Sequence, residues 1–234
     1  MATLASLCDG YRALVIGAGG AIGSAFVQQL RDDPRCASVL ALHRGSAPAI
    51  DVGEPSSITV AAAALRDAAP LNLVLVATGV LHGEGFAPEK RLADLDAWAM
   101  EQVLRINVVG PAMVLRHFTP LLDRQRSVMA LLSARVGSIG DNRLGGWASY
   151  RASKAALNML LKTASIELRR TNPAAVLAAL HPGTVRSALS RPFRGDVIGR
   201  DPRQAAAAML QALDSLRVED SGAFIAYDGQ RIPW

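Results

Sequence analysis

Short apolar runs alternate with helical patterns along the whole chain of 234 residues. The first run, residues 13–17, ends in a glycine-rich turn, and an amphipathic helical pattern follows at residues 21–30. Similar runs that favour buried strands lie at 38–42, 71–79, 127–133, 174–183 and 223–229, with a weaker run at 50–52. Helical patterns lie between these runs at 55–69, 92–106, 111–122, 150–169 and 201–216.

This alternation predicts a doubly wound Rossmann fold of the α/β class, with a mostly parallel seven-stranded sheet and helices on both faces. Central strands of such a sheet are buried on both sides, which explains why their sequences are almost continuously apolar. The sequence contains no internal repeat and no linker, and half of its residues are hydrophobic. We therefore expect a single domain over residues 1–234.

Composition and charge indicate whether nucleic acids, metals or membranes are expected partners of this chain. The net charge is +5, but the arginines are scattered and form no stripe with aromatic residues, so we expect no nucleic-acid partner. Cys8 and Cys36 have neither a CxxC spacing nor a histidine at ligand spacing, which predicts no metal site and a reducing, cytoplasmic location. No run of about 18 apolar residues and no export signal is present, so we expect no membrane association.

The segment GAGGAIG, residues 17–23, has the position and composition of a phosphate-binding turn. Glycines between a strand and a helix let a pyrophosphate approach the backbone, and the helix N-terminus offers free N–H groups to an anion. Glycine-rich turns also occur merely to reverse a chain, so the flanking strand and helix favour the nucleotide interpretation. The expected cofactor contacts in this turn are Gly17, Gly19, Gly20, Ala21, Ile22 and Gly23.

His43 and Arg44 stand roughly 20 residues beyond the glycines, where a Rossmann fold that prefers NAD usually carries an acidic residue. A guanidinium at the end of the second strand can neutralise the 2′-phosphate of NADP. The sequence therefore favours NADP(H), with NAD(H) as the alternative cofactor. The competing interpretation is an ordinary surface arginine after a strand.

Tyr150 and Lys154 lie four residues apart in the segment YRASK, at the predicted start of a helix, and therefore on one helix face. A neighbouring ammonium favours the phenolate and lowers the pKa of a tyrosine below its usual value of about 10. The pair thus predicts a tyrosine that acts as an acid or base near neutrality. The alternative is a partly exposed structural pair on a helix.

Together these motifs resemble those of the classical short-chain dehydrogenases/reductases over essentially the whole chain, and residues 133–159 are similar to the subgroup that includes the bacterial C-signal protein (C-factor). In that family the tyrosine gives a proton to the carbonyl oxygen as hydride arrives from the nicotinamide. The lysine lowers the tyrosine pKa and binds the nicotinamide ribose. The resemblance gives these roles to Tyr150 and Lys154, and it implies that Asn107 in RINVVGP holds a water in a proton relay.

The resemblance implies further cofactor contacts. Asp51 matches an aspartate that contacts the adenine, although it could equally cap the turn into the next helix. The family's PG motif, which contacts the nicotinamide end, is matched by residues 182–185. The full set of implied contacts outside the glycine turn is His43, Arg44, Asp51, Val52, Ala77, Thr78, Gly79, Tyr150, Lys154, Pro182, Gly183, Thr184 and Val185.

Three positions depart from the family pattern. Ala21 replaces the middle glycine of GxxxGxG, and residues 76–79 replace the customary NNAG. At the position where the family has the serine that polarises the substrate carbonyl, this chain has Ala134. Ser133, one residue earlier, is our candidate for this role, with Ser138 in reserve. Adjacent strand residues point to opposite faces, so Ser133 can take the role only if the chain twists or bulges there.

The resemblance implies an NAD(P)(H)-dependent oxidoreductase that interconverts a carbonyl and a secondary alcohol by hydride transfer. A small-molecule substrate would be selected by the loops at 82–91 and 185–200. Relatives commonly form homodimers or homotetramers through helices near 107–122 and 150–169. The alternative is an NAD(P)-binding signalling or regulatory protein with vestigial catalysis, which the three departures favour.

Overall fold

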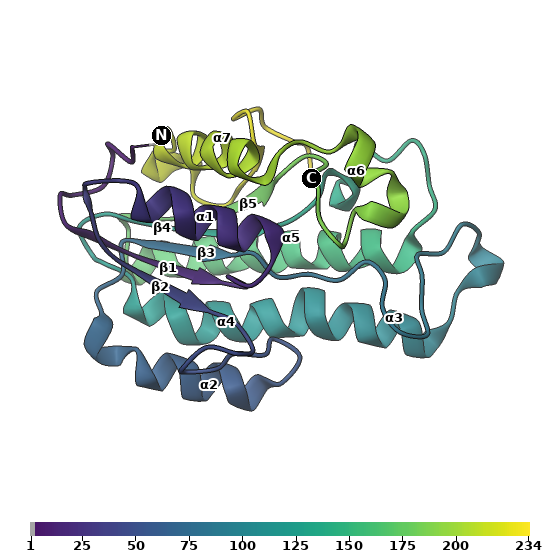
Figure 1. Ribbon diagram of the computed structural model, residues 1–234, viewed down its shortest axis with the longest axis horizontal. Helices are drawn as coiled ribbons and strands as arrows, with labels where there is room; N and C mark the ends of the chain where they lie inside the picture. Colours follow the sequence, from purple (N-terminus) through teal and green to yellow (C-terminus); the bar gives the residue numbers. More distant parts are fainter. Residues whose placement is uncertain (1–2) are drawn as a thin grey trace.

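Six parallel strands form one sheet in the computed structural model, which describes residues 3–234 (Figure 1). Their order is β2-β1-β3-β4-β5-β6. Because neighbouring strands are parallel, each connection must cross the sheet, and helices make these crossings, which confirms the predicted α/β Rossmann class. The strands are β1 (Tyr11–Ile16), β2 (Cys36–Leu42), β3 (Leu73–Val76), β4 (Ser127–Leu132), β5 (Ala175–His181) and β6 (Ala223–Ala226).

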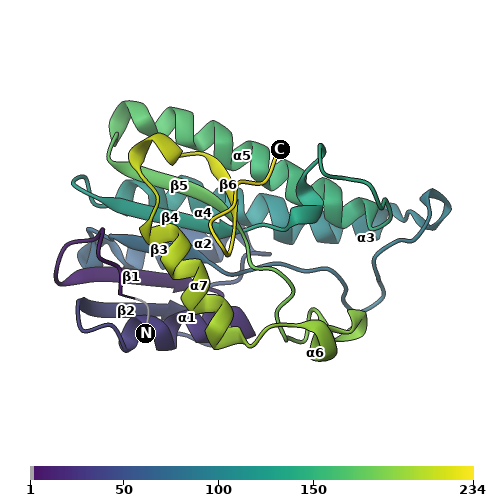
Figure 2. The same cartoon turned by 90° about the horizontal axis from the view of Figure 1, so that it is seen from above.

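Helices cover both faces of this sheet. α1 and α7 pack on one face, and α2, α4 and α5 pack on the other (Figures 1 and 2). No helix within residues 3–234 is both long enough and apolar enough to cross a membrane. The helices are α1 (Ala21–Arg31), α2 (Pro55–Ala64), α3 (Ala97–Leu104), α4 (Gly110–Phe118), α5 (Ala148–Thr171), α6 (Gly195–Ile198) and α7 (Pro202–Asp214).

Successive residues of each central strand belong to different hydrophobic cores. In β1, Ala13 and Val15 face the core beneath α1 and α7, whereas Leu14 and Ile16 face the core beneath α2, α4 and α5. The same alternation continues through β3, β4 and β5. Both faces of the sheet therefore exclude water, which is why these strands carry almost no polar residues.

The seventh predicted strand, at residues 50–52, is not formed, and this part of the prediction was wrong. The N–H of Ile50 donates to the carbonyl of His43 over 3.1 Å. The N–H of Asp51 donates to Ser57 Oγ over 2.9 Å. Since local turn bonds already satisfy this backbone, the segment has no ladder to form, and β2 is left as the edge strand of the sheet.

The two helices predicted at 92–106 and 111–122 are joined rather than separate. A π-helical turn, Arg105–Val109, links α3 directly to α4, and its flanking residues keep right-handed helical backbone angles. Pro111 cannot donate a backbone hydrogen bond and its ring would crowd the carbonyl of Asn107, four residues earlier. A widened turn accommodates this proline without breaking the helix.

The two-sided burial of β5 leads to a stability prediction. Leu177→Ala removes a side chain with no solvent exposure and should lower the free energy of unfolding by about 2–5 kcal/mol. Leu92→Ala makes the same chemical change at a side chain that is 79% exposed, and its effect should stay within about 0.5 kcal/mol. Urea unfolding of both variants measures the difference. Equal effects would contradict the placement of Leu177 in the core.

Candidate active site

Tyr150 and Lys154 occupy the first two turns of α5, beside the carboxyl end of β4. The Lys154 ammonium lies 5.8 Å from the centre of the Tyr150 ring and donates a hydrogen bond of 2.9 Å to the carbonyl of Leu132. Lys154 is buried and Tyr150 is half-buried. The structure thus brings together the two residues that the YxxxK spacing placed on one face.

Burial acts on the pKa of both groups. It raises the pKa of Tyr150 to about 12 and lowers the pKa of Lys154 to about 8, because each charged form loses solvation. The sequence led us to expect a lowered pKa for the tyrosine. The shift is in the opposite direction, because burial removes the phenolate from water.

Asn107 closes the other side of this site from within the π-helical turn. Its Nδ2 donates to the carbonyl of Val80 and to Ser153 Oγ, over 2.8 and 3.1 Å, and its Oδ1 accepts the N–H of Val80 over 2.8 Å. Asn107 is fully buried. Its side chain therefore fixes the loop after β3 against the start of α5.

Gly79 lies between the two polar groups of this site. A Cβ at this position would lie 3.3 Å from Lys154 Nζ and 3.4 Å from Asn107 Oδ1. These distances are tighter than ordinary van der Waals contacts. A glycine here lets the backbone after β3 pass close to both groups.

The two candidate serines have other hydrogen-bond partners. Ser133 is buried and its hydroxyl donates to Asn158 Oδ1 over 2.6 Å, two helical turns beyond Tyr150. Ser138 is also buried, and its Oγ accepts the N–H of Asp141 over 3.1 Å. The role of Ser133 as the carbonyl-polarising group thus stays a prediction, and it would require the hydroxyl to leave Asn158.

The glycine turn lies at the same end of the sheet and fits an anionic dinucleotide. A Cβ at Gly17 would lie only 2.7 Å from the carbonyl oxygen of Ala77, and a Cβ at Gly23 would overlap the Gly17 carbonyl. Gly20 precedes α1 and provides no side-chain cap, so the first N–H groups of this eleven-residue helix are available to a phosphate. Ala21 occupies the first position of α1, where a methyl group is accommodated.

His43 and Arg44, two of the predicted cofactor contacts, lie next to the glycine turn. The N–H groups of Gly17 and Ala18 donate to the carbonyl of Leu42, which joins the turn to the end of β2. The following residues, His43 and Arg44, are half-buried and exposed, and the His43 ring lies 3.6 Å from where a Cβ of Gly19 would be. No carboxylate in the described part of the chain pairs with Arg44.

The side chain of Asp51 has a hydrogen-bond partner within the described residues, whereas the hydroxyl of Thr78 has none. Asp51 Oδ1 accepts the N–H of Gly53 over 2.9 Å, which is the local turn contact that the sequence left open as an alternative to adenine binding. Thr78 Oγ1 is buried and has no partner within residues 3–234. A buried hydroxyl without a partner beside the glycine turn is available to a ligand.

The segment after β5 brings the predicted nicotinamide contacts to this edge. Pro182 follows β5, and the Tyr227 ring packs so closely on Gly183 that a Cβ there would lie 2.9 Å from it. The carbonyl of Thr184 accepts the N–H of Arg200 over 2.9 Å, and Val185 is buried. These contacts fix both ends of the predicted substrate loop 185–200.

Two buried polar groups that were not predicted from the sequence, Asn158 and Glu89, make hydrogen bonds that position α5. Asn158 accepts a hydrogen bond from the Ser133 hydroxyl. Glu89 accepts hydrogen bonds from both the hydroxyl and the N–H of Ser149, the residue before Tyr150. An asparagine within a helix interior was a usable signal for Asn158. No local pattern identifies Glu89, because its partner lies 60 residues along the chain.

Comparisons with known proteins agree with this geometry. Residues 11–197 match the short chain dehydrogenase family. The chain is 32% identical to a 1-hydroxy-2-glutathionyl-2-methyl-3-butene dehydrogenase of Rhodococcus, over 94% of this chain and 98% of the relative. It is 37% identical to C-signal of Myxococcus xanthus, over 61% of this chain and 83% of that protein.

A solved structure is similar across the whole fold. The NADPH-bound carbonyl reductase from chicken fatty liver superposes with a TM-score of 0.82 at 25% identity, covering 97% of this chain and 96% of that structure. The match to the family therefore extends over most of the chain and agrees with its six-stranded Rossmann sheet. This protein belongs to the short-chain dehydrogenase/reductase family of oxidoreductases.

Proposed function

We propose that the chain, as one cofactor-binding domain over residues 1–234, is an NADP(H)-dependent enzyme that interconverts a carbonyl compound and a secondary alcohol. The observation that carries this proposal is the position of Tyr150 and Lys154. Half-buried Tyr150 and buried Lys154 lie beside Asn107 and Gly79, at the end of the sheet that also holds the glycine turn.

The Tyr150 hydroxyl acts as the acid in the reductive direction. Since burial raises the pKa of Tyr150 to about 12, the phenol keeps its proton at neutral pH and can give it to the carbonyl oxygen. When bound, the nicotinamide supplies the hydride. In the oxidative direction the same residue must act as a base in its phenolate form, and the raised pKa keeps that form scarce at neutral pH.

Lys154 and Asn107 support this proton transfer. The buried Lys154 ammonium, fixed by the Leu132 carbonyl, provides positive charge beside the phenol and a donor for a ribose hydroxyl. Pro111 has no N–H, so the backbone carbonyl of Asn107 lacks the donor that an ordinary helix would supply four residues later. That carbonyl is the acceptor for the water of the proposed proton relay.

The residues around the glycine turn favour NADP(H) over NAD(H). Arg44 is an exposed cation two residues after β2, close to the turn, and a 2′-phosphate is the anionic group that distinguishes the two cofactors. The NADPH-bound state of the chicken carbonyl reductase supports the same choice.

The direction of the reaction and the assembly are parts of the same proposal. The Rhodococcus relative is named as a dehydrogenase of a hydroxy compound, whereas the chicken protein is named as a carbonyl reductase, so both directions need assay. Exposed Met159 and Ile166 on α5 support a homodimer or homotetramer that buries this helix.

A second candidate function is a signalling protein that binds NAD(P) without turnover. The similarity to C-signal and the departures at Ala21, Ala77 and Ala134 favour it. Tyr150 together with the buried Lys154 and Asn107 favours the enzyme, because an unused buried lysine costs stability.

Tyr150→Phe decides between these two functions. In the enzyme, loss of the phenolic proton should lower kcat for reduction of a ketone by at least about 100-fold, while NADPH still binds. Tyr11→Phe is the matched control. Tyr11 is the first residue of β1, at the end of the strand opposite the glycine turn, and its hydroxyl donates a hydrogen bond to Asp33. NADPH consumption followed at the nicotinamide absorbance measures both variants. Binding of NADPH without turnover in the wild type would favour the signalling protein.

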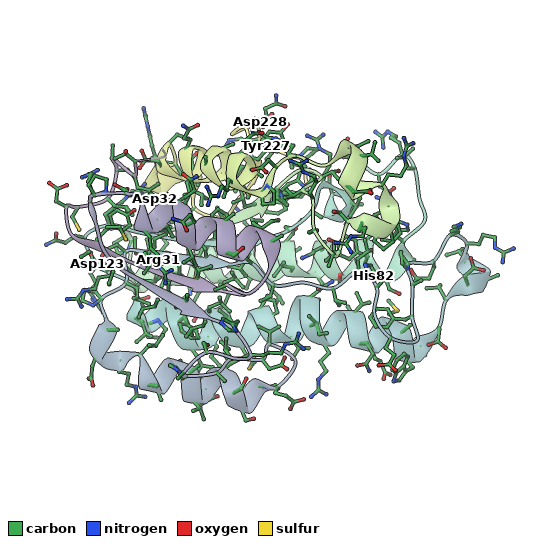
Figure 3. The ribbon with its side chains drawn as sticks, in the orientation of Figure 1. Arg31, Asp32, His82, Asp123, Tyr227 and Asp228 are labelled. Carbon is green, nitrogen blue, oxygen red and sulfur yellow. The ribbon has the colours of Figure 1, made fainter. Side chains whose placement is uncertain are left out.

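Arg44→Asp tests the cofactor preference. The ratio of kcat/KM with NADPH to kcat/KM with NADH should fall by at least about tenfold, because the substitution replaces attraction to a 2′-phosphate with repulsion. Arg31→Asp makes the same charge change at the far end of α1, as Figure 3 shows, and should leave the ratio close to that of the wild type. An unchanged ratio in Arg44→Asp would overturn the NADP(H) assignment.

The pH profile tests the role of Lys154. The pKa of its ammonium is lowered to about 8, so the ammonium is charged below this pH and neutral above it. Ketone reduction should therefore be independent of pH near 7 and decline as the pH rises through about 8, well below the pKa of Tyr150. Lys154→Met should lower kcat and remove this inflection. An inflection that persists in Lys154→Met would assign it to another group.

A further inference from the structure

The backbone just before Tyr150 has an unusual conformation. Gly145, Gly146 and Trp147 have φ values of +61°, +64° and +53°, so three consecutive residues are left-handed. Glycine adopts this conformation freely, but a bulky aromatic residue does so rarely. Other contacts must therefore hold Trp147 in place.

Two residues, buried Glu89 and half-buried Arg151, supply these contacts. The N–H of Trp147 donates to the carbonyl of Glu89 over 2.6 Å, and the Glu89 carboxylate accepts the hydroxyl and the N–H of Ser149. The Arg151 guanidinium donates to the carbonyls of Gly145 and Gly146 over 2.9 and 2.8 Å. A buried carboxylate at the first turn of α5 is also favoured by the helix dipole.

In this conformation the Trp147 ring lies beside the ring of Tyr150. The ring centres of Trp147 and Tyr150 are 6.3 Å apart with an interplanar angle of 74°. On its other side Trp147 contacts Phe193 of the predicted substrate loop, with centres 5.0 Å apart and an angle of 61°. Both geometries are the edge-to-face arrangement that aromatic rings prefer.

His82 extends the same aromatic surface. Its ring centre lies 5.9 Å from that of Phe193, and its Nε2 lies 3.2 Å from the Leu189 carbonyl. Figure 3 shows His82 at the end of the molecule where α6 lies. Trp147, Phe193 and His82 thus come from three separate segments, and together they form what we call the aromatic wall beside Tyr150.

The aromatic wall is notable because this chain is poor in aromatic residues, which make up 5% of the sequence. Aliphatic side chains fill most of both hydrophobic cores. Aromatic rings held edge to face offer flat apolar surfaces, which a planar apolar group contacts better than a puckered one of equal size.

We infer that Trp147 is a specificity-determining residue whose ring, held by Glu89 and Arg151, selects carbonyl compounds with a planar aryl group next to the carbonyl. This inference rests on the proposed function, since it assumes that the carbonyl oxygen lies at the Tyr150 hydroxyl. It assigns a substrate class to the site and a function to the left-handed backbone before α5.

The test compares acetophenone with cyclohexyl methyl ketone, which have the same carbon framework but differ in ring planarity. In the wild type, kcat/KM with NADPH should be higher for acetophenone. Trp147→Asn removes the aromatic ring and keeps a residue that tolerates the left-handed backbone, so the aryl preference should fall about tenfold. Trp147→Phe restores an aromatic ring and should recover much of the preference.

Phe193→Leu provides an independent variant that leaves the start of α5 unchanged. It keeps an apolar side chain but removes the flat face that contacts Trp147, and the aryl preference should again fall. An aryl preference that is absent in the wild type, or unchanged in both Trp147→Asn and Phe193→Leu, overturns the inference while the proposed function stands. Binding of NADPH with no turnover of either ketone overturns the proposed function, and this inference with it.

Discussion

The hydrogen bond from the Lys154 ammonium to the Leu132 carbonyl fixes α5 against the sheet. It can form only because α5 comes very close to the loop after β4: a Cβ at Gly137 would lie 2.7 Å from the Cβ of Lys154. The same approach buries Lys154 and lowers its pKa. Position, burial and proton affinity of this group thus follow from one packing constraint.

The π-helical turn also contributes to the surroundings of Lys154, through the hydrogen bonds of Asn107. Asn107 reaches across to the loop after β3 and to Ser153 of α5, so its amide joins three elements around Lys154. Pro111 prevents an ordinary helical turn at this point, and the widened turn places a polar residue in an otherwise apolar interior. The distortion therefore belongs to the site, because it carries Asn107.

The start of α5 shows how distant residues determine a local conformation. The N–H of left-handed Trp147 donates to the Glu89 carbonyl, and the Arg151 guanidinium donates to the carbonyls of the two glycines before it. Glu89 also caps the first turn of α5, where the helix offers no acidic residue of its own. Tyr150 follows directly, so its orientation relative to Lys154 depends on a carboxylate from a loop 60 residues earlier.

The sequence alone determined the alternation of strands and helices, the glycine turn and the pairing of Tyr150 with Lys154, because each depends on residues close together in the chain. Only the tertiary structure decided that residues 50–52 form a turn, that one continuous helix contains Asn107, and that Ser133 binds Asn158. It also reversed the expected pKa shift of Tyr150, because burial depends on the packing of the whole fold. Local spacing specifies which groups can meet, whereas solvation and long-range contacts decide how they behave once they do.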